Sequence, residues 1–366
     1  MRVRDCKSEL RALTAAWSSH LSHDPRRLTA LGWNGSLESA FTDASSDGRR
    51  GLVVRVDGRV VTVLTDAGQE RVPLSATLSG VPDDGNITTG DWLVIEDGVA
   101  VHVLQRRSAL MRRAAGVATS GQVVAANIDL VFITVALGVP LRLRRIERAL
   151  AMAWSSGAAP VVLLTKSDLS ADIDADLRAA RSVSGGTEVI AVNASGAGLA
   201  RLHEILLEGL VAVLIGPSGT GKSTLVNRLS GNEALATAEV RVDGKGRHTT
   251  THRELIELPG GGLIIDTPGT RELGLWDAGA GIDEVFGDLT EVAAQCRFRN
   301  CKHEREPGCA VRAAAADDPT VLARLESKRK LEREQERLDA AKDLRAQAER
   351  RRELRRRTRA MRQQSP

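Results

Sequence analysis

The hydrophobic positions of the chain first recur with a period of two, from Gly51 onward. The alternation runs through two stretches, GLVVRVDGRVVTVLTDAGQERVPL and, after Gly90, WLVIEDGVAVHVL. Asp57-Gly58 separates two strand-like runs, as a tight turn between antiparallel strands does. About fifty residues of such strands favour a five-stranded barrel. We therefore expect an N-terminal OB-fold β-barrel over residues 49–107, preceded by an N-terminal extension over residues 1–48 that packs as an arm.

From Ile128 the pattern changes to apolar runs that alternate with helical stretches. The strand-like runs are IDLVFITVAL, PVVLL, EVIAV and VAVLI, and the helical stretches include RRIERALAMAWSSG and LARLHEILLEG. This βαβ pattern predicts a mostly parallel sheet with helices on both faces. We place this central α/β domain at residues 108–290, a small helical module rich in Cys and His at 291–334, and a basic helical or disordered tail at 335–366.

Composition adds a strongly asymmetric charge to this picture. The chain has 366 residues, of which 42% are hydrophobic and 27% charged, as in a globular protein of several domains, and its net charge is +4. Arg345–Arg362 holds nine arginines against two glutamates, net +7, which leaves −3 for the rest of the chain. We expect this segment to act outward, on nucleic-acid phosphates, or to be a solvated helix.

The cysteines and the apolar stretches indicate where the protein works. Three of the four Cys are bunched between Cys296 and Cys309, which favours a metal site in a reducing compartment, whereas Cys6 is left over and expected to be inert. The N-terminus has no apolar core, and the longest apolar stretch, near residues 128–141, contains Asp129 and is too short to span a bilayer. We expect a cytoplasmic protein without membrane insertion.

A glycine-rich loop follows the apolar strand VAVLI and opens the helical stretch STLVNRLS, which is the context that a P-loop requires. The glycines let backbone N–H groups face phosphates. Lys222 is then expected at the β- and γ-phosphates and Ser223 as a Mg²⁺ ligand. The alternative is a glycine-rich turn with a chance lysine. The expected nucleotide-binding residues here are Gly216, Pro217, Ser218, Gly219, Thr220, Gly221, Lys222, Ser223 and Thr224.

A second motif, Asp266-Thr267-Pro268-Gly269, ends another apolar strand, GLIID. The carboxyl end of a strand is where α/β sheets bind ligands. We expect Asp266 to hold Mg²⁺ through water and the N–H of Gly269 to sense the γ-phosphate. Without the P-loop, this motif could equally be a plain turn.

Two further motifs point to the base. A carboxylate at Asp168, after PVVLL, can accept hydrogen bonds from both N1–H and the exocyclic amine of guanine, and adenine lacks that pair of donors. GTP is therefore favoured over ATP, because a mismatched base leaves buried polar groups unpaired. Asn193-Ala194-Ser195 follows one βα unit later, and the N–H of Ala194 could reach the guanine carbonyl. The expected base-site residues are Thr165, Lys166, Ser167, Asp168, Asn193, Ala194 and Ser195.

The base motifs precede the phosphate motifs, whereas ordinary GTPases have the opposite order. Circular permutation explains this order, and folds with neighbouring termini tolerate it. The permuted order, together with Gly246–Thr251, Ala126–Asp129 and Glu306–Val311, resembles the ribosome small-subunit-dependent GTPase A family from about Leu31 to about Glu334. The resemblance implies an OB-fold, a permuted GTPase and a zinc-binding C-terminal domain. It also implies late maturation of the small (30S) ribosomal subunit, with subunit-stimulated GTP hydrolysis, binding to its rRNA and release after hydrolysis.

Thr165 and Asn193 depart from that family's pattern, which more usually has Asn and Ser at these positions. We expect these substitutions to loosen the hydrogen bonding of the base loops without removing the selectivity of Asp168.

Four ligands in the C-terminal patch suit one structural Zn²⁺. Cys and His are the ligands that zinc prefers, and four of them close a tetrahedral site that has no vacant position for chemistry. Free buried cysteines are the alternative. The expected ligands are Cys296, Cys301, His303 and Cys309.

The loop Gly246–Thr251 adds two catalytic candidates. Thr250 is expected to coordinate Mg²⁺ and sense the γ-phosphate, although Thr249 or Thr251 could take that place. His248 could position the attacking water, or it could be a solvent-facing loop residue. Because Thr270 stands where many GTPases use Gln, we expect slow intrinsic hydrolysis of GTP to GDP and a site completed by the partner.

Two rival functions stay open beside a monomeric small-subunit GTPase. One is an RNA-binding scaffold with a degenerate nucleotide site, which the complete motif set disfavours. The other is a P-loop GTPase that regulates a translation factor or another protein partner. If the barrel contacts RNA, its near lack of aromatic residues favours phosphate contacts, with a solvated basic rim as the alternative. The candidates are Arg55, Arg59, Arg106 and Arg107.

Overall fold

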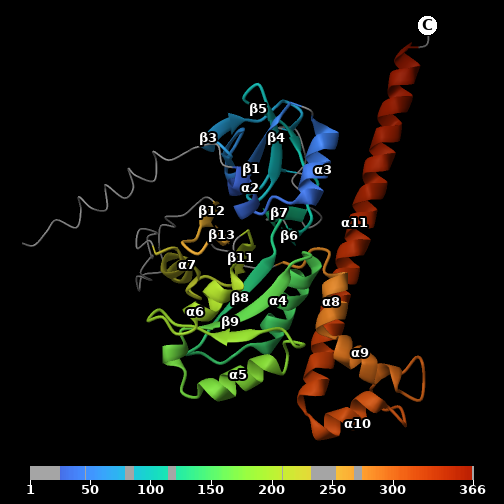
Figure 1. The fold of residues 1–366 in the computed structure, drawn as a ribbon. Coiled ribbons are helices and arrows are strands. Elements are labelled where there is room, and N and C mark those ends of the chain that lie inside the picture. The colour runs from blue at the N-terminus through green and yellow to red at the C-terminus, as the bar shows by residue number, and fades with distance from the viewer. Residues whose placement is uncertain are drawn as a thin grey trace, which may run out of the picture.

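Three parts follow one another along the molecule: a small β-barrel, an α/β sheet and a group of C-terminal helices (Figure 1). The structure is a computed structural model, and it describes residues 25–45, 47–78, 86–113, 121–207, 209–231, 253–267 and 274–364.

The N-terminal barrel has the predicted antiparallel strands. The sheet order is β3-β2-β1-β4-β5, and a parallel bridge between Leu74 and Ala100 brings the two edges together. Helices α2 and α3 pack on it, with Trp33 edge-to-face against Trp92 at 4.8 Å between ring centroids. The predicted barrel is thus present, and residues 25–44 of the predicted N-terminal extension form two helices that pack on it. The elements are α2 (Pro25–Ala30), α3 (Gly35–Ala44), β1 (Arg49–Asp57), β2 (Val60–Thr65), β3 (Gly68–Pro73), β4 (Trp92–Glu96) and β5 (Val99–Val103).

A hairpin that the sequence did not predict joins the barrel to the sheet. It consists of β6 (Ala109–Arg113) and β7 (Gly121–Ala126). Beside it, the Asn127 side chain accepts a hydrogen bond from the N–H of Arg107 and donates one to the carbonyl of Gly90. Asn127 has a φ of 52°, in the left-handed region that Asn tolerates. The Asn127 side chain therefore links the start of the α/β domain to the backbone of the barrel.

The central sheet has the order β10-β9-β8-β11-β13-β12 and is parallel except for β12. Its strands are almost wholly buried because helices cover both faces: α4 and α5 pack on one, α6 and α7 on the other. The predicted doubly covered α/β sheet is confirmed. The elements are β8 (Leu130–Ala136), α4 (Leu143–Ser155), β9 (Ala159–Thr165), the short helix η2 (Ser167–Leu169), α5 (Ile173–Arg181), β10 (Val189–Ala191), α6 (Leu199–Ile205), β11 (Val211–Ile215), α7 (Lys222–Ser230), β12 (Glu254–Glu257) and β13 (Leu263–Asp266).

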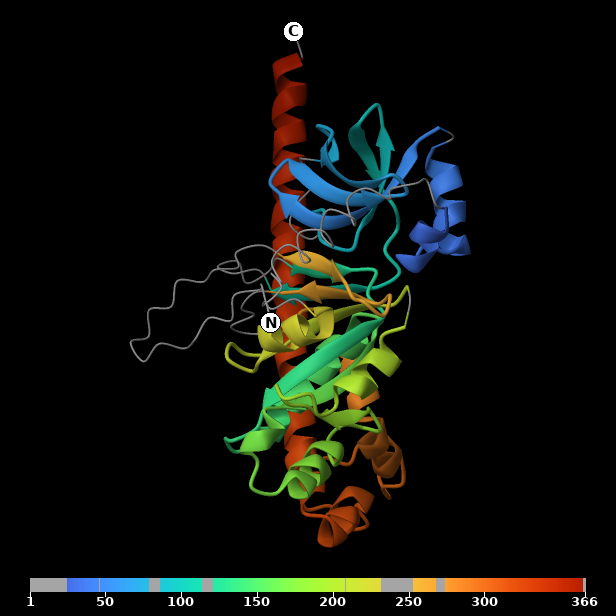
Figure 2. The ribbon, with the colours of Figure 1, turned by 60° about the vertical axis from the view of Figure 1, so that its left-hand side comes forward.

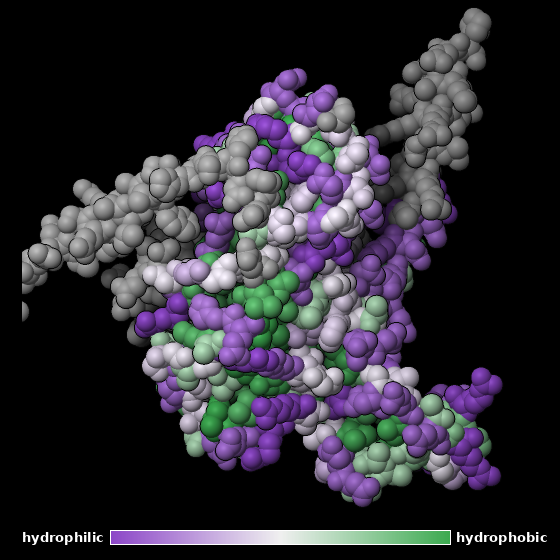
Figure 3. All heavy atoms as spheres, viewed as in Figure 1, coloured by the Kyte–Doolittle hydropathy of each residue, from purple (hydrophilic) through white to green (hydrophobic). Residues whose placement is uncertain are grey.

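The C-terminal part consists of α8 (Gly279–Val285), α9 (Gly287–Ala294), α10 (Ala310–Asp317) and α11 (Thr320–Gln364). Figures 1 and 2 show α11 running past the sheet to end beyond the level of the barrel. Figure 3 shows a largely hydrophilic surface on its described part. The predicted boundary at residue 335 falls inside this helix. Gln335 and Leu338 are still buried, and Gln335 accepts a hydrogen bond from Ala278, so the projecting segment starts further along. No helix among the described residues is long and apolar enough to cross a membrane.

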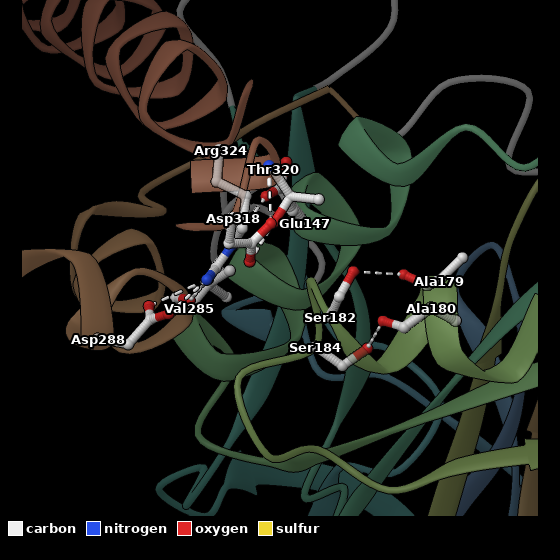
Figure 4. Close-up of polar contacts among 10 residues, drawn as sticks. All are labelled: Glu147, Ala179, Ala180, Ser182, Ser184, Val285, Asp288, Asp318, Thr320 and Arg324. Carbon is white, nitrogen blue, oxygen red and sulfur yellow. Dashed lines mark hydrogen bonds and ion pairs between the residues drawn. The ribbon is translucent and has the colours of Figure 1, made fainter. Parts of the chain in front are cut away.

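A buried ion cluster fixes α11 to the α/β domain (Figure 4). Arg324 on α11 lies 3.5 Å from Glu147 on α4, pairs with Asp288 on α9 and donates to the carbonyl of Val285. Glu147 is 1% exposed. Burial raises the pKa of its carboxyl, and Ser327 and the Arg324 charge offset part of that rise. The buried charges of Glu147 and Arg324 therefore compensate each other, and loss of either one leaves the other without its partner.

Replacement of Arg324 by Met is expected to destabilise the protein by about 3–5 kcal/mol, because it strands the Glu147 carboxylate in the interior. The loss should be larger at neutral pH than near pH 5. A raised carboxyl pKa means that the folded state holds the proton longer, so stability falls as pH rises past the ordinary Glu range. Urea unfolding at both pH values measures this effect.

Two controls accompany that prediction. Arg144→Met breaks a pair with Glu326 that is exposed on both sides and should cost less than about 1 kcal/mol. The double variant Glu147→Met/Arg324→Met should recover most of the stability. Equal losses in the free energy of unfolding for Arg324→Met and Arg144→Met would contradict the conclusion that the buried cluster fixes α11 to the α/β domain.

Candidate nucleotide site and metal centre

The predicted P-loop lies between β11 and α7, as the sequence pattern requires. Gly216, Gly219 and Gly221 have φ angles of 147°, 81° and 85°, in the region that favours glycine. A Cβ on Gly216 would lie 2.2 Å from the Thr134 hydroxyl, so a side chain has no room there. The loop is therefore shaped by its glycines and by contact with β8.

Lys222 is buried and folds back over its own loop. Its Nζ donates to the carbonyls of Gly216 at 2.7 Å and Pro217 at 2.8 Å. Burial lowers the pKa of its ammonium group, and the charge of Asp266 opposes that shift. The Lys222 ammonium group is therefore held at the loop by hydrogen bonds to two carbonyl oxygens, and oxygens of a bound anion could take the place of these acceptors.

Asp266 ends β13 beside the P-loop strand, since Val213 on β11 is in register with Ile265 on β13. Burial raises the pKa of the Asp266 carboxyl, Lys222 counteracts the rise, and Glu254 on the paired strand β12 adds to it. The hydroxyl of Thr267 donates to the carbonyl of Leu214 at 2.6 Å. The buried Asp266 carboxylate ends the strand beside the one that leads into the P-loop, and Ser223 lies in the first turn of α7. A carboxylate and a hydroxyl are oxygen donors that suit Mg²⁺.

The predicted base motifs come together at the other end of the P-loop. A hollow of about 150 Å³ is lined by both motifs and by the first turns of α7. Asp168 lies on η2, is exposed, and has no hydrogen bond or ion pair with any described residue, so its carboxylate can accept from a ligand. The lining residues are Thr165, Lys166, Val192, Asn193, Ala194, Gly221, Thr224, Leu225 and Arg228.

The two positions that depart from the family pattern both make local hydrogen bonds. The Thr165 hydroxyl donates to the carbonyl of Thr220 at 2.7 Å and so ties the base loop to the P-loop. The Asn193 side-chain carbonyl accepts from the Ser195 hydroxyl at 2.8 Å and from the N–H of Ala197 at 3.0 Å. Thr165 therefore keeps a link between the base and phosphate ends of the site.

Two groups of candidates fall outside the described residues. They are Gly246–Thr251, with His248 and Thr250, and Pro268–Thr270, with Gly269.

The four predicted metal ligands form one cluster, with all ligand atoms within 4.8 Å of one another. His303 Nδ1 lies 3.5 Å from Cys296 Sγ and 3.4 Å from Cys309 Sγ, and the two sulfurs are 4.0 Å apart. Tetrahedral zinc with ordinary bond lengths separates N from S by about 3.6 Å and S from S by about 3.8 Å. Cys301 completes the set, so the residues fit one zinc ion.

The barrel arginines are mostly engaged within the protein. Arg106 forms a bidentate pair with the fully buried Asp91, at 2.7 and 2.8 Å, and Arg107 pairs with Asp129 at 2.8 Å. Arg55 pairs with Asp57 at 2.9 Å. The expectation that these arginines contact phosphates loses support, and for Arg106 in particular an internal structural role fits better.

Comparisons with known proteins agree with this geometry. The family described as RsgA GTPase matches residues 103–276. A protein of Streptomyces coelicolor named small ribosomal subunit biogenesis GTPase RsgA is 45% identical over 352 residues, which cover 93% of this chain and 94% of that protein. A protein of the same name from Opitutus terrae is 41% identical over 84% of this chain and 89% of its own length.

Two solved structures share the fold. YjeQ from Thermotoga maritima is 28% identical with a TM-score of 0.56, covering 78% of this chain and 97% of its own. YloQ, described as a circularly permuted GTPase, is 23% identical with a TM-score of 0.54, covering 80% of this chain and 96% of its own, and supports the fold alone.

Proposed function

Because the chain belongs to the RsgA GTPase family, a family of circularly permuted GTP-hydrolysing enzymes, we propose how its own residues bind GTP and how hydrolysis controls its attachment to the small ribosomal subunit. The observation that carries the proposal is the meeting of three motifs at one edge of the sheet. The P-loop follows β11, Asp266 ends β13, and the two base motifs follow β9 and β10, all at the carboxyl ends of parallel strands of one sheet.

At the phosphate end, Lys222 is proposed to exchange the carbonyls of Gly216 and Pro217 for oxygens of the β- and γ-phosphates. The loop N–H groups and the start of α7 would contact the remaining oxygens. The Ser223 hydroxyl and Asp266, through water, would hold Mg²⁺, which neutralises charge on the phosphates when bound. Thr250, Gly269 and His248 keep their proposed roles at the γ-phosphate and the attacking water.

At the base end, Asp168 is proposed to read guanine, because its carboxylate is exposed and unengaged beside the hollow. Its replacement by Asn offers one acceptor and one donor where guanine needs two acceptors. We expect the preference for GTP over ATP to fall by roughly 100-fold. Competition binding against labelled GTP measures both affinities, and Asp174→Asn, a nearby exposed carboxylate, is the matched control. An unchanged GTP-to-ATP ratio would rule out this role of Asp168.

The Cys3His cluster is proposed to hold one structural Zn²⁺, since four protein ligands leave no position for substrate. Clustered thiols also support the proposed cytoplasmic location. We also propose that the protein acts as a monomer.

The proposed cycle links nucleotide state to binding of the small (30S) subunit and its rRNA: the GTP form docks and hydrolysis releases it. Co-sedimentation with purified small subunits tests this cycle, with a non-hydrolysable GTP analogue, GDP or no nucleotide. We expect retention with the analogue and release with GDP. Equal retention under all conditions, or equal binding to large subunits, would favour the alternative of a GTPase that regulates another protein partner.

A further inference from the structure

Two hollows of the surface share one lining residue, Arg113. The first, of about 510 Å³, lies between the P-loop and the start of α4. The second, of about 570 Å³, lies along α11. A bidentate pair between Arg148 and Glu334, at 2.7 Å for both contacts, joins α4 to α11 at their boundary. We call the joined surface the arginine groove; its charged residues are Arg113, Arg142, Arg145, Arg148, Lys330, Arg333, Glu334 and Arg337.

The charge of this groove is almost purely positive. Glu334 is its one acid, and Arg148 engages it, while Arg113 and Lys330 lie close enough to help lower the pKa of its carboxyl. Some other surface arginines of the described chain carry acidic partners, as Arg49 does with Glu70 and Arg201 with Glu188, whereas others, such as Arg178 and Arg181, stand singly on α5. In the groove, several exposed cations form no ion pair with described residues: Arg113, Arg142, Arg145, Lys330, Arg333 and Arg337.

Such a set of cations repels itself, so a bound polyanion would relieve it. The array is also long. Lys330, Arg333 and Arg337 recur at helical spacing on α11. The helix continues to Gln364, and its sequence beyond residue 344 is rich in arginine. From residue 330 to residue 362 a helix spans about 48 Å, far more than a single nucleotide occupies.

We propose that the arginine groove binds an RNA phosphodiester backbone, from the edge of the P-loop to the projecting end of α11. Guanidinium groups match phosphate oxygens in pairs, and the groove offers no aromatic ring for base stacking, so the contact is to phosphates and independent of sequence. This assignment rests on the proposed function, in which rRNA is the available polyanion.

A salt series with a polyuridylate oligomer tests the groove directly. The variant Lys330→Gln/Arg333→Gln/Arg337→Gln removes three contacts and should flatten the log–log salt slope by about 2, at about 0.7 for each single-strand phosphate. The control Arg178→Gln/Arg181→Gln/Arg201→Gln removes the same charge from α5 and α6 and should keep the wild-type slope. Coincident slopes for wild type and the groove variant would overturn the proposal, as would equal competition by polyglutamate, which would indicate an acidic protein partner.

A truncation after Asp343 provides a second test of RNA binding by the groove. It spares the buried Gln335 and Leu338 and the contact of Lys342 with Trp276, so the melting temperature should stay unchanged. The salt slope should flatten further, because all the arginines beyond that point are lost. If the wild-type protein shows a steep salt slope for RNA binding but small subunits do not stimulate its GTP hydrolysis, the proposed function is refuted and the RNA-binding groove is not. A groove variant with an unchanged slope in a protein that small subunits still stimulate would refute the groove alone.

Discussion

Replacement of Lys222 by Ala is expected to abolish GTP turnover, with a fall of at least about 1,000-fold, while the fold survives. The ammonium group is the cation placed at the loop that would hold the phosphates, and removing a group that stabilises transition-state charge has this scale of effect. Its hydrogen bonds go to two carbonyls of the same loop, so the variant breaks no hydrogen bond between the P-loop and another element. Loss of its charge also removes the influence that keeps the Asp266 pKa from rising further.

Phosphate release under saturating GTP measures this effect, and thermal melting verifies the fold. Ser223→Ala should behave similarly, because it removes the proposed Mg²⁺ ligand. Arg178→Gln, an exposed cation on α5, is the control and should keep full activity. Wild-type hydrolysis by Lys222→Ala would remove the catalytic assignment.

Replacement of Cys301 by Ser is expected to release about one zinc per chain and to unfold the surrounding module. Structural zinc in small domains contributes about 10–16 kcal/mol of apparent binding free energy, and the loss of one ligand forfeits most of it. The module has little else to hold it, since residues 296–308 are exposed or half-buried and Cys309 is the buried member of the set.

Metal analysis and limited proteolysis together test that expectation. Cleavage should appear between α9 and α10, while the sheet domain, held by its own core, resists. Cys6→Ser removes a thiol outside the cluster and should keep one zinc and full resistance. A Cys301→Ser protein that is metal-free yet equally resistant would show that the fold does not depend on the metal.

The nucleotide motifs could be read from the sequence because the shape of a phosphate loop depends on neighbouring residues. Gly216, Gly219 and Gly221 supply the positive φ angles that the loop needs, and these are properties of short segments. The strands before each motif are buried on both faces and read as apolar runs. Local chemistry therefore indicated which residues gather at the sheet edge.

Pairs that form across long stretches of sequence could not be read in the same way. Arg106 and Arg107 looked like free cations, yet tertiary folding places Asp91 and Asp129 against them. The boundary of the tail was set too early, since charge dominates the pattern after residue 335 and hides the buried Gln335 and Leu338. The arginine groove likewise joins residues from 113 to 337, which no local pattern connects.

Phosphate release from GTP and from ATP, with and without purified small subunits, shows most directly whether the protein is a GTPase that acts with the small ribosomal subunit. We expect slow hydrolysis of GTP alone, marked acceleration by small subunits but not by large ones, and negligible hydrolysis of ATP throughout. Equal turnover of ATP and GTP, or a GTP rate that small subunits leave unchanged, would contradict this expectation.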